Sequence, residues 1–341
     1  MKASDVSGLI TWQRRARHIS VAATLSWASA VMALGAVMPN AWAQTYPAKA
    51  ITVVLPIGPN TAFFVALRQM ADQMQEKIGK PIIFETAIGA SGTLAPARVK
   101  RAEADGHTIG LTFSWPMTVD PYVRKEQPPY DVLKDFSYIT MLTRHGVLFV
   151  AGAKVPANTV QELIALAKAK PGTVKVGVGA TGSRVGLYQL QDATGVQFFD
   201  VPYKSSADFP AALLSGEIDL AMSTAGTEIG MIRSGRTKAM FIGSRNRSSL
   251  LPNTQSITEV YPNVEIISWY GLYAPTGTPQ DRITWLHREW TTAIKDPKIV
   301  EKMQTIFGYE IVASTPQEML DQIKREIPES VRIGKQYKFS D

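Results

Sequence analysis

Two short segments of small residues carry the clearest chemistry in this 341-residue sequence. They read Gly89-Ala90-Ser91-Gly92-Thr93 and Gly179-Ala180-Thr181-Gly182-Ser183, and a helix is predicted directly after each. Unhindered backbone N–H groups beside a helix N-terminus bind an anion without needing a fixed charge. Two such loops facing each other across a cleft would hold two carboxylates, or the two ends of one acid. Plain β–α turns are the alternative for either loop alone.

Residues typical of enzymes are scarce. The three histidines after residue 43 (His107, His145 and His287) show no metal-ligand spacing, and the Gly-x-Ser-x-Gly motif of hydrolases is missing from the sequence. The chain has no cysteine, which excludes thiolate metal sites and a cysteine nucleophile. We therefore expect no catalytic residues, no cofactor and no metal. Residues 177–182 fit the Gly-x-Gly-x-x-Gly nucleotide motif, with Asp200 as the acid it would need, but that motif alone is weak.

Of the net charge of +7, three units lie within the first 43 residues. Residues 1–43 contain four basic side chains and one acidic one, an Ala-rich apolar run over 19–38, and the sequence Ala41-Trp42-Ala43. This pattern predicts a secretory signal peptide that is cleaved after Ala43. A membrane anchor is the alternative, although Ala, Ser and Gly suit a signal peptide better. The remaining 32 basic and 28 acidic residues give +4 without a basic stripe, so we expect no nucleic-acid partner.

The rest of the chain alternates short β-branched runs with amphipathic helical segments. Strands are expected at 51–55, 82–85 and 108–113, with helices at 63–78 and 94–100 between them. A second set follows, with helices at 160–168, 185–194, 209–215 and 227–234 and strands at 174–178, 199–201, 219–222 and 238–242. This order predicts parallel sheets with ligand-facing loops at the carboxyl ends of their strands.

Two apolar runs are placed to cross between these sets. They are 138–142 with 148–150, and 266–273, while helices at 279–294 and 316–336 complete the first set. The sequence therefore predicts a two-lobed α/β clamshell with two crossing strands, each lobe a mixed, mostly parallel sheet flanked by helices. We expect residues 44–144 and 265–341 to form lobe 1 and residues 145–264 to form lobe 2. A ligand would bind between the lobes.

Several motifs, in order along the whole mature chain, resemble one family. They are Tyr46-Pro47-Ala48-Lys49, Gly89-Ala90-Ser91-Gly92, Ala104-Asp105-Gly106-His107-Thr108, Tyr130-Asp131-Val132-Leu133-Lys134-Asp135-Phe136, Val201-Pro202-Tyr203-Lys204 and the run 268–279. The sequence resembles the Bug-type periplasmic solute receptors of tripartite tricarboxylate transporters. The resemblance implies a monomeric type II periplasmic binding protein that captures a small organic acid and delivers it to a membrane permease.

The resemblance also implies a set of ligand-binding positions. These are Asn60, Thr61, Phe63 and Phe64 after the first strand, Gly89, Ala90, Ser91, Gly92 and Thr93 after the second, Ser114 and Trp115 after the third, and Gly179, Ala180, Thr181, Gly182, Ser183, Arg184, Ser223 and Thr224 in the second lobe. Arg184 would either clamp a carboxylate bidentately or lie exposed at a helix start.

One departure from the family pattern bears on the ligand. The family usually has a glycine triplet followed two residues later by Asp, where this chain has Asn60-Thr61-Ala62 and then Phe64. Losing that acid argues against an amino-acid ligand and favours a second carboxylate. Phe63, Phe64 and Trp115 would suit an aromatic ring, although neighbouring helix positions diverge by about 100°, so only one of the two phenylalanines can face the cleft.

The sequence thus predicts a receptor for an aromatic or otherwise rigid dicarboxylate, such as terephthalate. Two other functions remain as alternatives. A ligand-sensing receptor for a sensor kinase would have the same cleft, and a secreted hydrolase would turn over an ester substrate.

Overall fold

The fold was obtained as a computed structural model, which describes residues 46–59, 61–179, 181–203, 208–337 and 339. Contacts divide the chain after Ala48, and the unit that begins at Lys49 contains both sheets described below. The predicted signal peptide lies outside the described residues. Within those residues, no helix is both long enough and apolar enough to cross a membrane.

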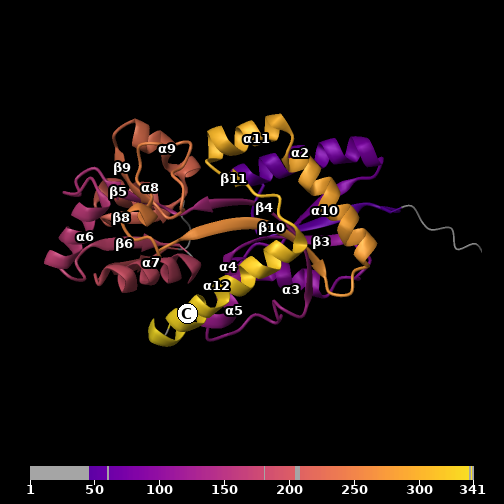
Figure 1. The fold of residues 1–341 in the computed structure, drawn as a ribbon, viewed down its shortest axis with the longest axis horizontal. Helices are drawn as coiled ribbons and strands as arrows, with labels where there is room; N and C mark the ends of the chain where they lie inside the picture. Colours follow the sequence, from indigo (N-terminus) through magenta and orange to yellow (C-terminus); the bar gives the residue numbers. More distant parts are fainter. Residues whose placement is uncertain (1–45, 60, 180, 204–207, 338, 340–341) are drawn as a thin grey trace, which may run out of the picture. The chain divides into compact units, whose positions relative to one another are not determined.

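The first sheet has six strands in the described chain (Figure 1). Their order across the sheet is β11 (Glu310–Ile311), β4 (Phe136–Gly146), β10 (Ile267–Pro275), β3 (Thr108–Phe113), β1 (Ile51–Leu55) and β2 (Ile82–Thr86). Strand β1 pairs in parallel with β2 and β3, whereas β10 runs antiparallel to β3 and β4. The carboxyl ends of β1, β2 and β3 therefore meet at one edge of the sheet.

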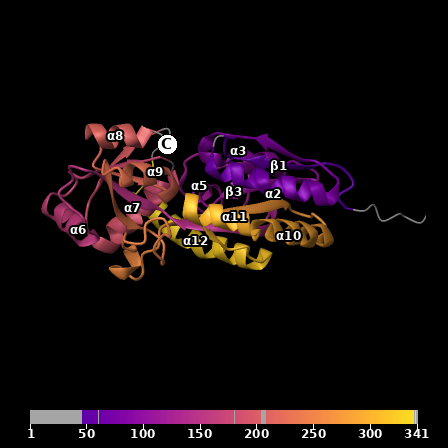
Figure 2. The same cartoon turned by 90° about the horizontal axis from the view of Figure 1, so that it is seen from above.

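Helices cover both faces of the first sheet, as Figures 1 and 2 show. One side of the sheet is covered by α2 (Ala62–Ile78), α10 (Gln280–Ile294) and α11 (Pro297–Lys302), and the π-turn η4 (Met303–Phe307) follows α11. The other side is covered by α3 (Leu94–Lys100) and α12 (Pro316–Tyr337). Successive residues of β10 point to opposite faces of the sheet: Tyr270 stacks on Phe63 of α2, whereas Trp269 packs with α12 on the other side. The short helices α4 (Trp115–Thr118) and α5 (Asp120–Val123) follow β3.

The second sheet has five strands in the described chain. Their order is β7 (Phe199–Pro202), β6 (Lys175–Val178), β8 (Leu220–Ser223), β5 (Leu148–Gly152) and β9 (Thr237–Ile242). Helices α6 (Val160–Ala169) and α7 (Thr181–Thr194) cover one face, and α8 (Phe209–Ser215) and α9 (Ala225–Arg233) cover the other. A 3₁₀ turn, η3 (Ile257–Glu259), lies between β9 and β10. We call each sheet with its helices a lobe.

The chain passes between the lobes at two adjacent points. Val147 joins β4 to β5, and Ile266 precedes β10; the Val147 N–H donates to the Ile266 carbonyl (2.9 Å). Gly243, which follows β9, donates its N–H to Val147 (2.8 Å) and accepts from the N–H of Ile266 (2.8 Å). These backbone bonds join the two crossing segments and the end of β9 into one connection.

The predicted fold class is confirmed: both sheets are mixed and flanked by helices. The expected parallel majority is not found, because the strands that cross between the lobes pair antiparallel with their neighbours. One local prediction is wrong. The segment 179–184 was expected to be a loop before a helix at 185, but α7 already begins at Thr181. Glycine is costly in a helix interior, yet the first turn tolerates it, and Gly182 is needed there for a packing reason given below.

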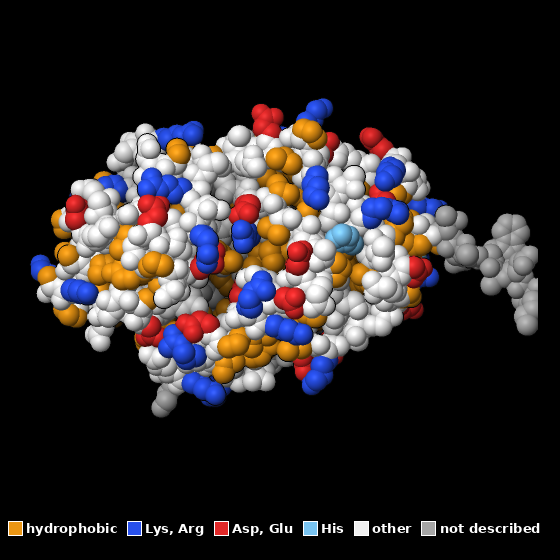
Figure 3. Space-filling model, in the orientation of Figure 1, with side chains coloured by type: hydrophobic (Ala, Val, Ile, Leu, Met, Phe, Trp, Pro, Cys, Tyr) orange, Lys and Arg blue, Asp and Glu red, His pale blue; other side chains and the backbone are white. Residues whose placement is uncertain are grey.

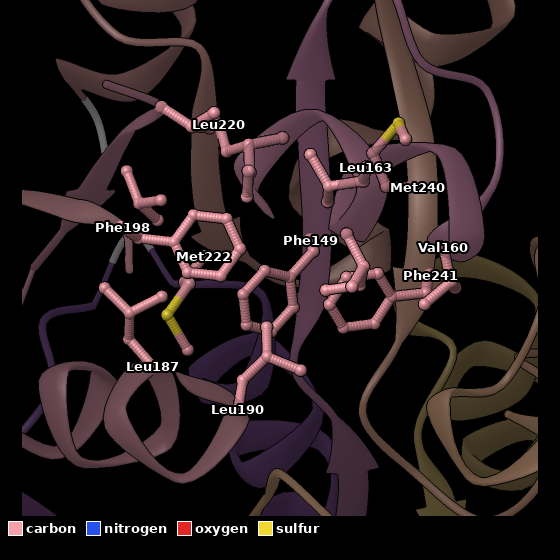
Figure 4. Packing of buried hydrophobic residues seen from close by; sticks show 14 of the residues in the cluster. Phe149, Val160, Leu163, Leu187, Leu190, Phe198, Leu220, Met222, Met240 and Phe241 are labelled. Carbon is pink, nitrogen blue, oxygen red and sulfur yellow. The ribbon is translucent and has the colours of Figure 1, made fainter. Parts of the chain in front are cut away.

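The core of the second lobe lies between its sheet and α6 and α7 (Figure 4). Phe149 of β5 is fully buried and stacks on Phe241 of β9, with 4.2 Å between ring centroids. Leu187 and Leu190 of α7 pack onto the same cluster. The position of α7, which begins with the second glycine segment, is therefore fixed by apolar packing on its opposite face.

This core gives a first prediction. Phe149→Ala should lower the free energy of unfolding by about 3–5 kcal/mol, because it removes a buried ring and leaves a cavity. Phe199→Ala makes the same change at an exposed side chain and should stay within about 0.5 kcal/mol of the parent. Urea unfolding followed by circular dichroism measures both. Equal losses for the two variants would contradict the packing described here.

Candidate functional site

The first glycine segment lies between β2 and α3 and has an unusual backbone. Residues 90–92 form a single 3₁₀ turn, η1. The backbone angle φ is positive at four consecutive residues: Gly89 (135°), Ala90 (46°), Ser91 (57°) and Gly92 (93°). Left-handed backbone at a non-glycine residue costs on the order of 1 kcal/mol, and such strain gathers at ligand-binding loops. Consecutive amides in such conformations form concavities that bind anions.

Internal bonds hold this turn in place. The Thr93 hydroxyl donates to the Ala90 carbonyl (2.8 Å), and Nη1 of Arg124 donates to the same oxygen (3.1 Å). The proton of the Thr93 hydroxyl is thus used within the loop. The groups of this segment suited to an anion are therefore its backbone amides.

Phe113 and Trp115 stand between the first glycine segment and the second. A Cβ at Gly92 would lie 2.7 Å from the Phe113 ring, and the Phe113 and Trp115 rings meet edge to face at 5.9 Å. Trp115 in turn lies on Gly182, where a Cβ would overlap the indole. The predicted pair of glycine segments is thus connected through two aromatic rings, each resting on a glycine.

Ser114 lies between these aromatics in the sequence and is almost fully buried. Its hydroxyl is 3.1 Å from the hydroxyl of Ser268 on β10, and either oxygen can be the donor. Sharing one proton between two hydroxyls leaves the other proton available for a ligand oxygen. Ser268 was not singled out from the sequence, although it belongs to the run 268–279 that carries the family resemblance.

The second glycine segment forms the first turn of α7. Thr181, Gly182 and Ser183 are helical, and Ala180 lies outside the described residues. The Ser183 hydroxyl accepts the N–H of Gly179 (3.1 Å). First-turn amides lie ahead of the intrahelical hydrogen-bond ladder and point out of the helix N-terminus, where an anion is favoured.

Arg184 is paired within the protein. Its Nε donates to Oδ2 of Asp200 on β7 at 2.9 Å, and its guanidinium lies 5.3 Å from the centre of the Phe339 ring. Both members of the ion pair are about a quarter exposed. In this arrangement the charge of Arg184 is balanced by Asp200, the residue that a nucleotide reading would have assigned to a ribose.

The aromatic residues at the start of α2 point in different directions. Phe63 is buried and stacks on Tyr270 at 3.9 Å, whereas Phe64 meets Phe84 of β2 edge to face at 5.3 Å. The hydroxyl of Thr61 donates to the Gly58 carbonyl (2.8 Å). Asn60 lies outside the described residues. Neither phenylalanine lies with Trp115, so Trp115 and Phe113 are the aromatic pair between the glycine segments.

Ser223 and Thr224 end β8 and begin α9. The Ser223 hydroxyl donates to Oε1 of Glu228 (2.9 Å), which is fully buried, and burial raises the pKa of this carboxyl. The hydroxyls of Thr224 and Thr227 are 2.9 Å apart, and Thr224 also hydrogen-bonds the side chain of Tyr309. These contacts place both predicted residues in a hydrogen-bonded network rather than among the glycine segments.

Tyr309 belongs to a buried aromatic cluster that the sequence did not indicate. His145 stacks on it at 4.3 Å, and Tyr270 hydrogen-bonds it. Burial lowers the pKa of His145 to about 4 and raises that of Tyr270 to about 12, so both are neutral at neutral pH. The cluster therefore supplies no net charge.

A cavity of about 720 Å³ adjoins the Trp115–Gly182 contact. Ser114, Trp115 and Gly182 line it together with Asp192 of α7 and Glu326 and Arg332 of α12. Figure 3 shows the surface hollowed over α7 and α12, with acidic and basic side chains around the hollow. Of the predicted ligand-binding residues that the structure describes, only Ser114, Trp115 and Gly182 line this cavity. The others do not: Thr61, Phe63, Phe64, the first glycine segment, Gly179, Thr181, Ser183, Arg184, Ser223 and Thr224.

Fold and site together define a two-lobed solute-binding receptor. The model of the tripartite tricarboxylate transporter family receptor (TctC) matches residues 66–338. The chain belongs to this family of periplasmic receptors, which bind solutes and are not enzymes. Protein BugT of Bordetella pertussis is 28% identical over 291 residues, covering 83% of this chain and 89% of that protein. A Cupriavidus necator protein from the gbd 5′ region is 30% identical over 293 residues, covering 84% and 87%.

Solved structures agree with this assignment. A periplasmic transporter protein shares 28% identity and superposes with a TM-score of 0.74, covering 85% of this chain and 97% of that one. Periplasmic binding protein BugD shares 26% identity with a TM-score of 0.72, covering 85% and 98%. R. palustris Rpa4515, solved with adipate, shares 24% identity and the fold, with a TM-score of 0.75 over 85% and 97%.

The Trp115–Gly182 contact gives a second prediction. Gly182→Ala should lower the free energy of unfolding by about 1–3 kcal/mol, because the added methyl group overlaps the indole. Gly230→Ala in α9 is the matched control: nothing lies within 4 Å of its Cβ position, so it should gain about 0.5–1 kcal/mol. Chemical denaturation measures both variants.

Trp115→Ala should relieve the cost of Gly182→Ala. A double-mutant cycle should therefore show a coupling of about 1 kcal/mol or more. Additive effects on the free energy of unfolding would mean that the two residues do not interact.

Proposed function

We propose that this receptor captures a small dicarboxylate, with an aromatic dicarboxylate such as terephthalate as the specific case. One observation carries the proposal. Two backbone-amide segments, Gly89–Thr93 in the first lobe and 179–183 in the second, are connected through an aromatic pair. Each segment suits one carboxylate, and the rings suit the body of the ligand.

The first carboxylate is assigned to the amides of residues 89–92 and the hydroxyl of Ser114. The second is assigned to the first-turn amides of α7 with Thr181 and Ser183. Because Asp200 balances Arg184, neither segment adds a net positive charge. Neutral donors bind an anion reversibly, which suits a protein that must release its ligand.

Phe113 and Trp115 supply the apolar part of the site. An offset-stacked ring gains about 0.5–1.5 kcal/mol beyond its burial. Phe64, at the position where the family usually has Asp, packs on Phe84 and adds no charge for a ligand ammonium. R. palustris proteins of this fold solved with adipate and with malate support a ligand with two carboxylates.

The proposal includes export and delivery. The signal peptide would be removed after Ala43, and the loaded receptor would pass its ligand to the membrane permease of a tripartite tricarboxylate transporter. Membership of the receptor family supports the second step. The basic, apolar and Ala-x-Ala pattern of residues 1–43 supports the first.

Titration calorimetry with terephthalate, adipate, malate and aspartate tests the ligand class. We expect binding of at least one dicarboxylate, and Ser183→Ala should weaken it about tenfold by removing a hydroxyl and freeing the Gly179 amide. Ser234→Ala, which removes an exposed hydroxyl at the end of α9, is the control and should leave the Kd unchanged. Tight binding of aspartate without any dicarboxylate would refute the proposal.

Intact mass spectrometry of the exported protein tests the leader. The expected mature chain begins at Gln44. A mass that includes residues 1–43 would instead establish a retained anchor.

A further inference from the structure

The C-terminal helix contacts both lobes. The first half of α12 is anchored on the first sheet, where Met319 and Ile323 are fully buried in the cluster that contains Trp269. The second half extends to α7 of the second lobe. Pro328 lies between the two halves. Because proline has no N–H and its ring crowds the preceding turn, the helix is weakest at that residue.

The second half is held to the first lobe by an apolar contact. Ile333 is fully buried with Val119 and Val123, which flank and end α5. A Cβ at Gly334 would lie 2.9 Å from a methyl of Val123, so α12 and α5 approach closely there. Val185 of α7 completes this small cluster.

The polar part of the contact with the second lobe centres on Asp192 of α7. Arg332 donates Nη1 to Oδ2 (2.7 Å), and Gln336 donates Nε2 to Oδ1 (3.1 Å). The Tyr337 hydroxyl donates to the same Oδ1. One carboxylate thus accepts three donors from three residues of α12. Although burial opposes ionisation, these donors hold the pKa of Asp192 below its usual range.

Two aromatic contacts extend this interface toward the candidate site. Tyr337 stacks on Tyr188 with 4.1 Å between ring centroids and 10° between planes. One turn earlier in α7, Arg184 lies over Phe339, which follows α12. The end of the chain therefore contacts α7 at the helix whose first turn carries the second glycine segment.

We propose that residues 332–337 and 339 form a latch that holds α7 against the first lobe, and that the strength of this latch sets the balance between closed and open receptor. The apolar contact of Ile333 and Gly334 with Val123 keeps the latch on the first lobe. Asp192 and Arg332 are partly exposed and line the 720 Å³ cavity, so water reaches the polar contact when it separates. Opening breaks the bonds to Asp192 and the Tyr188–Tyr337 stack.

Double electron–electron resonance between spin labels on the two lobes tests the latch. The chain has no cysteine, so Glu76→Cys on α2 and Lys168→Cys on α6 introduce two exposed labelling sites. In the ligand-free protein, Asp192→Ala should raise the ratio of open to closed receptor about tenfold, because it removes all three bonds. Tyr337→Phe, which keeps the stack and loses one donor, should give a smaller shift in the same direction.

Glu329→Gln is the matched control. It changes a carboxylate that accepts two hydrogen bonds from Arg332 within α12 and leaves every acceptor on α7 in place. Its distance distribution should match that of the parent. The proposal fails if Asp192→Ala gives the parent distribution, or if Glu329→Gln lengthens the distances as much. Because no ligand is added, this result is separate from the success or failure of the dicarboxylate proposal.

Discussion

The indole of Trp115 rests on the backbone of α7, and this contact requires a residue without a side chain at position 182. Much of the candidate site depends on it. Trp115 is itself fixed by Phe113, and Phe113 lies against Gly92 in the first glycine segment. The two glycines therefore serve packing as well as amide exposure, since each lets an aromatic ring approach the backbone. One short path of contacts thereby sets how the two anion-binding segments are spaced.

Charges near this path are paired within the protein. Arg184 is balanced by Asp200, and Asp192 by Arg332, while burial keeps His145 neutral. A buried, unpaired charge costs several kcal/mol, so a site at a lobe interface is more readily built from amides and hydroxyls. Such a site selects anions by the direction of its dipoles. Because the site itself carries no net charge, the modest net charge of the chain after residue 43 says little about the ligand.

Local patterns predicted the fold well because they depend on neighbours in the sequence. The strand at 51–55 and the helix at 94–100 agree with the structure to the residue, as their apolar periodicity is set by burial alone. The two glycine segments could likewise be predicted locally, from small residues directly before a helix. Local patterns do not reveal the start of α7, because glycine at position 182 is required by a tryptophan 67 positions away.

Other side-chain contacts of the structure could not be predicted, because their partners lie far away in the sequence or on other elements. Nothing local to Arg184 indicates Asp200, and nothing local to Asp192 indicates Tyr337, which is 145 residues later. Phe63 and Phe64 could be expected to diverge, but only the positions of Tyr270 and Phe84 decide which one is buried. Tyr309 and His145 are brought together by the pairing of β11 with β4, a contact that no sequence spacing encodes.

The latch and the ligand are coupled, because each favours the closed receptor. A ligand shifts the balance only by its preference for the closed form, so contacts that close the empty receptor reduce the closure that binding can add. A large apolar contact would therefore make a poor latch. The ion pair with Arg332, which is nearly half exposed, contributes about 0.2–1 kcal/mol. The hydrogen bonds from Gln336 and Tyr337 add to it, so the Asp192 contact biases closure without fixing it. Because water can replace the polar bonds to Asp192 when the lobes separate, this part of the interface suits a receptor that must reopen.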